Sequence, residues 1–113
     1  MGRVMRPAIV LVLAMGAAAA GQRTQTFTGV VTDSECSNAD HSHMRMGPTD
    51  AECVNACVSE HGASYVLYDG KNTYTLSDQK TAEGFGAKKV IVTGTLDPKT
   101  KTIHVASIKT DGR

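Results

Sequence analysis

The chain has 113 residues, 41% of them hydrophobic, with twelve basic and eleven acidic side chains and a formal net charge of +1. This near-balanced charge excludes the strongly basic surface that nucleic acid or anionic lipid would require, so we expect no nucleic-acid partner and no membrane-bound mature form. A chain this short forms one domain with a modest core, the size class in which disulfides or metals often supplement packing.

The first twenty residues have the pattern of a cleavable secretory signal. Arg3 and Arg6 precede a short apolar run, and a series of small residues then ends at Ala20. The apolar run is shorter than the roughly 20 residues that a membrane span needs. We therefore predict a signal peptide at residues 1–20 and a secreted or periplasmic domain at residues 21–113, in an oxidising compartment where thiols either pair or hold a metal.

Beyond the signal the pattern is mostly β. Alternation is clearest in KKVIVTGTL, where Val90 and Val92 share one face while Ile91 and Thr93 share the other. Runs rich in β-branched and aromatic residues predict five strands in all, at residues 27–33, 64–69, 73–77, 88–96 and 102–108.

The last strand carries two further expectations. Ile108 is out of phase with Ile103 and Val105, which predicts a bulge near Ala106 and Ser107. His104 alternates with the apolar residues on either side of it, so we expect its side chain to face solvent.

The order of these elements predicts a mainly β fold. We expect a small five-stranded OB-like barrel with a Cys/His-rich loop and one short helix inserted after strand 1, at residues 34–62, and a short helical segment before strand 4. An open meander sheet covered by the insertion is the alternative.

The insertion contains one clear helix signal. Thr49 to Glu52 has the form of a capping box, and Gly62 supplies a stop signal, so we predict a helix from Asp50 to His61. Cys53 and Cys57 would then lie one turn apart and point the same way.

The insertion also gathers the residues that can bind a soft metal. Cys53 and Cys57 can form a two-thiolate clamp, with a third sulfur from Cys36 and an imidazole from the preceding loop. Sulfur and imidazole suit zinc or copper, and thioethers favour Cu(I). The candidate ligands for a copper or zinc ion are Cys36, His41, His43, Cys53, Cys57, Met44 and Met46.

Other interpretations of the same residues remain open. Cys36 can form a disulfide with one of the helical cysteines, which leaves the other thiol free. The protein would then be a ligand-binding module whose loop is fixed to the helix by a disulfide. Cys53 and Cys57 can instead perform thiol redox chemistry, or the thiols can be inert core residues. An odd number of cysteines in an exported protein weighs against pure stapling. The hairpin tyrosines could contact a ligand, although sheet packing explains them as well: Tyr65, Tyr68 and Tyr74.

No catalytic motif is evident. The chain has no G-x-S-x-G elbow. The residue types of a hydrolytic triad are present in Asp33, Ser34, Glu35 and the histidines, but no motif supports such a triad. We therefore expect a metal-binding protein without catalytic activity. The sequence does not identify a protein partner.

Several segments together carry a resemblance. FTGVVTDSEC, CVNAC, YVLYDGKNTYTL and VIVTGTLDPKTKTIHVASIK, in this order, resemble a group of small, uncharacterised exported bacterial proteins, and the likeness covers nearly all of the predicted mature chain. The resemblance implies export but no activity. The C-x-x-x-C pair with a nearby histidine is also similar to the copper site of Sco-type copper-delivery proteins, although the chain lacks their thioredoxin-type βαβ order.

Overall fold

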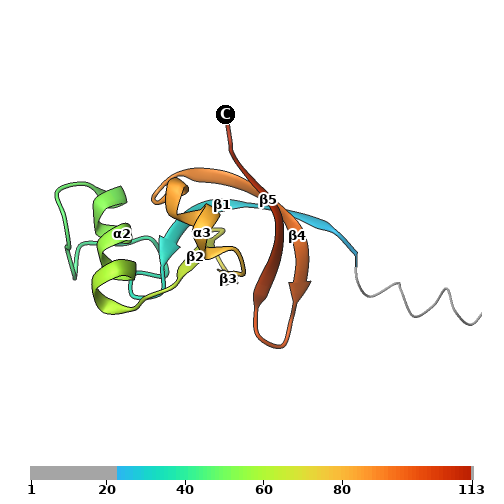
Figure 1. Ribbon diagram of the computed structural model, residues 1–113, viewed down its shortest axis with the longest axis horizontal. Helices are drawn as coiled ribbons and strands as arrows, with labels where there is room; N and C mark the ends of the chain where they lie inside the picture. Colours follow the sequence, from blue (N-terminus) through green and yellow to red (C-terminus); the bar gives the residue numbers. More distant parts are fainter. Residues whose placement is uncertain (1–22, 113) are drawn as a thin grey trace, which may run out of the picture.

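The computed structural model describes residues 23–112, so the predicted signal peptide at residues 1–20 lies outside the described residues. All five predicted strands and the predicted helix are present (Figure 1). No helix in this range is long and apolar enough to cross a membrane. The elements follow the order β1 (Gln25–Asp33), α2 (Asp50–His61), β2 (Tyr65–Tyr68), β3 (Thr73–Leu76), α3 (Gln79–Ala82), the 3-10 helix η2 (Glu83–Phe85), β4 (Lys89–Asp97) and β5 (Thr102–Thr110).

The five strands close into a ring. Their order is β1, β2, β3, β5, β4, and β4 returns to β1 through pairs that run from Gln25↔Gly94 to Val30↔Lys89. β3 and β5 are parallel, whereas the other neighbours are antiparallel. The predicted mainly β fold with a helix after the first strand is confirmed. The open meander is wrong, because the first strand pairs with the fourth.

Apolar side chains inside the ring form the core. Val90 and Val92 of β4 are fully buried, whereas Ile91 and Thr93 on the opposite face are only partly buried, as the alternation predicts. Burying one such aliphatic side chain contributes roughly 1.5–3 kcal/mol to folding. The other fully buried aliphatic residues of this core are Val31, Val54, Leu67, Leu76, Ala82 and Ile103.

β5 carries the predicted bulge. Thr93 pairs with Ser107 and Gly94 pairs with Val105, so Ala106 has no partner on β4. The extra residue brings Ile108 back against the core, where it packs partly buried. Gly94 is required beside the bulge, because a Cβ at this position would collide with the carbonyl oxygen of His104. The side chain of His104 is exposed, as predicted.

Helix α2 has the predicted bounds, and local capping explains both ends. The Thr49 hydroxyl accepts a hydrogen bond from the backbone N–H of Glu52 (3.1 Å), which satisfies one of the free amides of the first turn. Gly62 ends the helix with a positive φ of 71°, a conformation that glycine adopts without a steric penalty.

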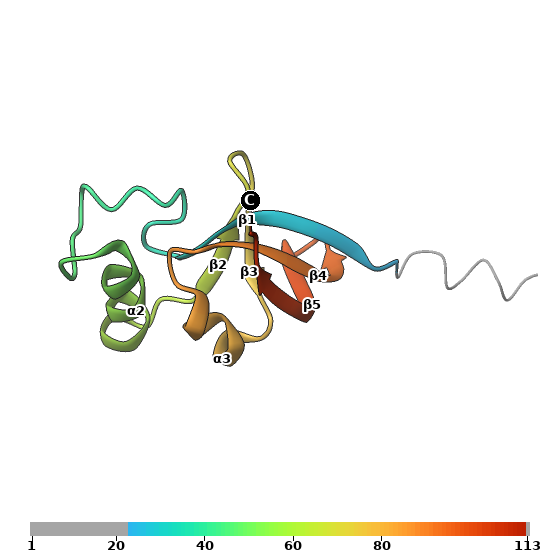
Figure 2. The same cartoon turned by 90° about the horizontal axis from the view of Figure 1, so that it is seen from above.

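The two ends of the insertion lie side by side on the sheet. The backbone N–H of Ser34 donates to the carbonyl of Ser64 (2.9 Å), and the N–H of Ser64 donates to the Ser34 hydroxyl (2.9 Å). Helix α2 and the loop before it lie together at one end of the molecule, while β4 and β5 extend from the other side (Figures 1 and 2). Val54 anchors the helix, since its side chain is fully buried in the core.

Candidate metal centre

The site begins at the end of β1, where the chain turns around the side chain of Asp33. This residue is fully buried, and its Oδ1 atom accepts hydrogen bonds from the backbone N–H groups of Glu35 (2.9 Å) and Cys36 (3.0 Å). The hydroxyl of Thr32 donates to the carbonyl of Cys36 (2.8 Å) and tightens the same turn. Cys36 is therefore held beside the Asp33 carboxyl group.

His41 completes a buried group of three. One ligand atom each from Asp33, Cys36 and His41 lies within 4.8 Å of the other two, and all three residues are buried. Metal–ligand bonds of about 2.0–2.3 Å place the ligand atoms of a tetrahedral zinc site roughly 3.3–3.8 Å apart. A contraction of at most about 1–1.5 Å would therefore bring these three donors around one ion.

Two atoms of this group have no hydrogen-bond partner among the described residues. They are Oδ2 of Asp33 and Nδ1 of His41, both buried. An unsatisfied buried polar atom costs about 1–3 kcal/mol, so native proteins rarely leave such atoms unpaired without a function. A metal cation coordinated by a carboxylate oxygen and an imidazole nitrogen would satisfy both atoms at once.

The two thiols of α2 lie near this group but outside the set of three. Cys53 and Cys57 are fully buried and lie one helical turn apart on α2. Burial, followed by the nearby Asp33 carboxyl group and the Cys53 thiol, raises the pKa of Cys57 to about 12. Burial, Asp33 and Cys53, in that order, also raise the pKa of Cys36. These mutual influences place three thiols and one carboxyl group in a common buried region.

All three cysteines are free, and no disulfide is present among the described residues. A disulfide between Cys36 and the helix is therefore not part of this structure. The redox interpretation also lacks support at Cys57, because a reactive thiol needs a lowered pKa and access to solvent, whereas Cys57 has a raised pKa and is fully buried.

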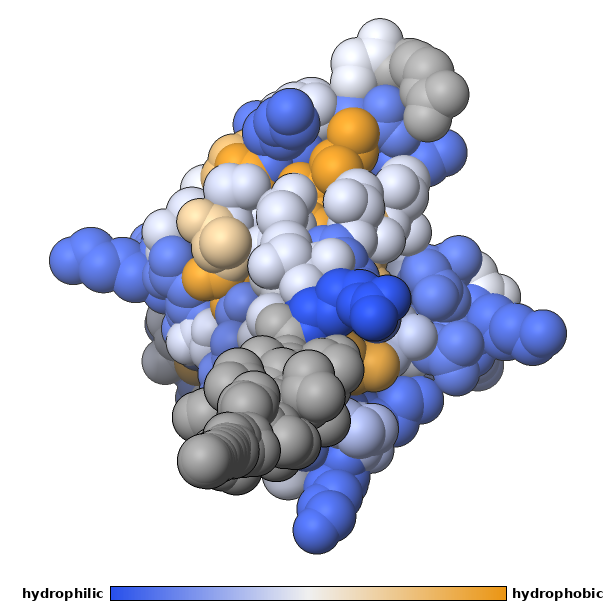
Figure 3. Space-filling model, turned by 90° about the vertical axis from the view of Figure 1, so that its right-hand side faces the viewer, coloured by the Kyte–Doolittle hydropathy of each residue, from blue (hydrophilic) through white to orange (hydrophobic). Residues whose placement is uncertain are grey.

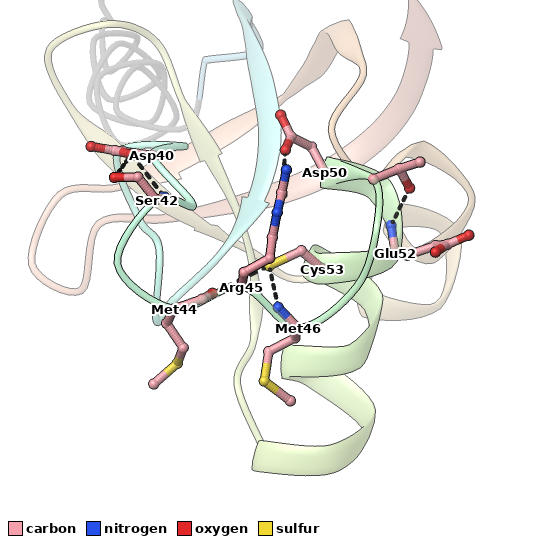
Figure 4. A network of polar contacts seen from close by, with 9 residues as sticks. Asp40, Ser42, Met44, Arg45, Met46, Asp50, Glu52 and Cys53 are labelled. Carbon is pink, nitrogen blue, oxygen red and sulfur yellow. Dashed lines mark hydrogen bonds and ion pairs between the residues drawn. The ribbon is translucent and has the colours of Figure 1, made fainter.

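The remaining candidates lie on the loop between Cys36 and α2, which also carries His41. His43 is exposed, Met44 is 42% exposed and Met46 is partly buried. The backbone of this loop nevertheless contacts a thiol (Figure 4). The N–H of Met46 donates to Sγ of Cys53 (3.3 Å), and that thiol in turn donates to the carbonyl of Met44 (3.5 Å).

A hollow of about 360 Å³ lies in front of His41. His41 therefore belongs both to the buried group and to a surface that solvent reaches. An ion pair between Arg45 and Asp50 (2.6 Å) ties the loop to the first turn of α2 at this hollow. The lining residues are Ala39, Asp40, His41, Ser42, Arg45 and Asp50.

Two of the hairpin tyrosines make contacts within the fold, whereas Tyr68 is partly exposed and lines a surface hollow. Tyr65 is buried, and its hydroxyl donates to Oδ1 of Asn55 (2.7 Å) on α2. Tyr74 packs its ring against that of Phe27 at a centroid distance of 5.5 Å. On this side of the molecule, the described residues show hydrophobic surface as small separate spots (Figure 3).

Asp33 is the member of the site that was not predicted as a ligand from the sequence. Its signal was a carboxyl group at the end of a strand, directly after the β-branched residues Val30, Val31 and Thr32. Asp33 also lies three positions before Cys36. That spacing allows the aspartate to cap the turn that presents the thiol.

No family model matches the chain, and neither the curated proteins nor the solved structures contain a match to it. The class of protein is thus defined by fold and site: a mainly β domain whose five-stranded sheet closes in a ring and whose buried Asp/Cys/His cluster can hold a metal ion.

Proposed function

We propose that this protein is an exported, non-catalytic metal-binding domain that holds a copper or zinc ion in its insertion. The observation that carries the proposal is the pair of unpartnered buried atoms, Asp33 Oδ2 and His41 Nδ1, beside the thiol of Cys36. A fully apolar or fully satisfied pocket would give no reason to expect an ion.

The donor set fits either metal. Zinc accepts carboxylate, thiolate and imidazole ligands, which the group of Asp33, Cys36 and His41 supplies. Cu(I) prefers sulfur, and two further buried thiols lie on α2: Cys53 helps to raise the pKa of Cys36, and Cys36 helps to raise the pKa of Cys57. We propose that the α2 thiols provide the remaining ligands after a small rearrangement of the site.

Metal titration of the reduced chain from Gly21 to Arg113 tests this proposal. We expect tight uptake of one equivalent of Zn(II) or Cu(I). The affinity is measured by competition with a chromophoric chelator. Cys36→Ser and His41→Gln should each weaken binding at least tenfold, because each removes a ligand. His104→Gln is the matched control, since His104 is an exposed imidazole on β5. Absence of uptake by the unaltered chain would contradict the proposal.

For the scaffold, we infer an OB-type barrel. The features that support this are the ring order of the strands, the parallel pairing of β3 with β5, and the short helix α3 before β4. The barrel would act as a rigid support for the site, since Asp33 ends one of its strands.

We also propose export through the signal peptide at residues 1–20, in keeping with the resemblance to small exported bacterial proteins. Small residues at Ala18 and Ala20 suit signal-peptidase cleavage. Intact-mass measurement of protein recovered from a bacterial periplasm or medium should give a chain that begins near Gly21. Recovery of the uncleaved chain in the membrane fraction would contradict export.

A further inference from the structure

The loop before α2 exposes an unusual side chain. Met44 is the exposed large hydrophobic residue of residues 23–112, with 42% of its surface accessible. The other methionine in this range, Met46, lies only two positions further along the same loop. An exposed methionine beside a thiol cluster can distinguish between metal ions, because a neutral thioether binds Cu(I) and is a poor ligand for Zn(II).

The two thioethers are held in a defined orientation. Figure 4 shows the side chains of Met44 and Met46 extending to the same side of the loop, away from Asp50. Arg45, between them, extends toward Asp50 and pairs with it at 2.6 Å. Arg45 and the two methionines therefore extend to opposite sides of the loop.

The same loop lies directly over a buried thiol. Backbone atoms of Met44 and Met46 contact Sγ of Cys53 at 3.5 and 3.3 Å. Cys53 has no accessible surface of its own, and this loop covers it on one side. The thioethers and the exposed imidazole of His43 thus flank one approach to the buried thiols.

We propose that Met44 and Met46, assisted by His43, form a surface exchange site for a soft monovalent cation, Cu(I), through which the ion enters and leaves the buried cluster. This inference rests on the proposed function and deepens it by naming the class of ion and its route. Neutral thioethers bind Cu(I) more weakly than thiolates, so the ion moves on to the cysteines, and each thiol that binds it releases a proton to water. The copper remains Cu(I) throughout.

Methyl NMR and transfer kinetics test the exchange site. In the reduced chain from Gly21 with labelled methionine methyl groups, Cu(I), or Ag(I) as its redox-inert substitute, should shift the signals of Met44 and Met46, whereas Zn(II) should not. The variant Met44→Leu/Met46→Leu should keep its affinity for Zn(II) and transfer Cu(I) to a chelator at least tenfold more slowly. His61→Gln, which alters an exposed imidazole at the far end of α2, should transfer Cu(I) at the unaltered rate.

The outcomes separate the two proposals. Unshifted methyl signals or an unchanged transfer rate, in a chain that does bind metal tightly, would overturn the exchange site and leave the metal centre intact. Loss of tight Cu(I) binding in the double variant would also overturn it, because the thioethers would then belong to the buried coordination shell. Failure of the unaltered chain to bind any metal would refute the proposed function, and the exchange site with it.

Discussion

The substitution Asp33→Asn tests the metal centre because it changes charge with almost no change of shape. Asparagine can still accept the two turn hydrogen bonds that Oδ1 of Asp33 accepts from Glu35 and Cys36. It replaces the unpartnered Oδ2 atom with an amide nitrogen that cannot coordinate a metal. The weaker turn hydrogen bonds and the removal of a buried carboxyl group oppose each other, so the metal-free variant should differ in unfolding free energy by no more than about 1 kcal/mol.

The effect should appear when metal is added. At a free metal concentration of about 100 times the dissociation constant, the unaltered protein gains about 2.7 kcal/mol, which for a domain of this size is roughly 10–20 °C in melting temperature. Loss of a partner outside the coordination shell weakens metal binding by up to about a hundredfold, so loss of a ligand should weaken it at least as much. At a hundredfold weaker affinity the variant gains only about 0.4 kcal/mol, or roughly 2–3 °C.

The assay is thermal unfolding followed by circular dichroism, with and without metal, under reducing conditions. Asp69→Asn is a closely matched control. The Oδ1 atom of Asp69 likewise accepts from the amides two and three residues ahead, at Lys71 (2.8 Å) and Asn72 (2.6 Å), but this residue is exposed and forms no part of the cluster. A full metal-induced rise in the melting temperature of Asp33→Asn would refute the role assigned to the carboxylate.

Three further predictions concern the scaffold, the thiols and the loop. Val92→Asp should unfold the domain in circular dichroism, since an unpaired charge in the core costs several kcal/mol, whereas Thr93→Asp should be tolerated; equal damage would contradict the assigned faces. Burial raises the pKa of Cys57 to about 12 in the folded protein, against an ordinary thiol value of 9.0, so unfolding releases a proton at pH values between the two. Denaturant titrations of the metal-free protein should therefore show an unfolding free energy that falls from pH 9 upward. A flat profile would contradict the buried thiol. Arg45→Gln removes an exposed ion pair and should change global stability by less than about 1 kcal/mol while speeding hydrogen exchange of the Met46 amide; an unchanged exchange rate would show that the ion pair does not hold the loop.

The features that the sequence predicted best have local physical causes. Helix α2 begins and ends where Thr49 and Gly62 place its caps, and the alternation around Val92 assigns the faces of β4. Even the bulge at Ala106 follows from a shift in the apolar period along one strand. Each of these signals lies within a few residues of the feature that it specifies.

Two features could not be predicted from local sequence patterns. Closure of the ring depends on contacts between residues distant in sequence, and the set of residues in the buried group depends on the path of an irregular loop. The pairing of β1 with β4 joins Gln25 to Gly94. His41 and His43 are two positions apart, yet the first is buried and the second exposed, in a loop whose path includes a positive φ of 63° at Ala39. No periodicity distinguishes the two histidines. For Asp33, the unpaired oxygen that indicates a ligand is visible only once the surrounding side chains are in place.

The hydrogen bonds between Ser34 and Ser64 bring the two ends of the insertion at residues 34–62 together on the sheet. Because its two ends adjoin, an ancestral gene could gain, lose or exchange this segment in one step without altering the order of the strands. Deletion would remove the core contacts of Val54 and Val58, and the hydrogen bonds that Tyr65 and Thr73 donate to Asn55 and Ser37. The sulfur and imidazole donors would all travel with the insertion, whereas Asp33 would remain behind on the sheet. A related scaffold that received the insertion would therefore need an acidic residue at the end of its first strand before it could reproduce the three-residue group.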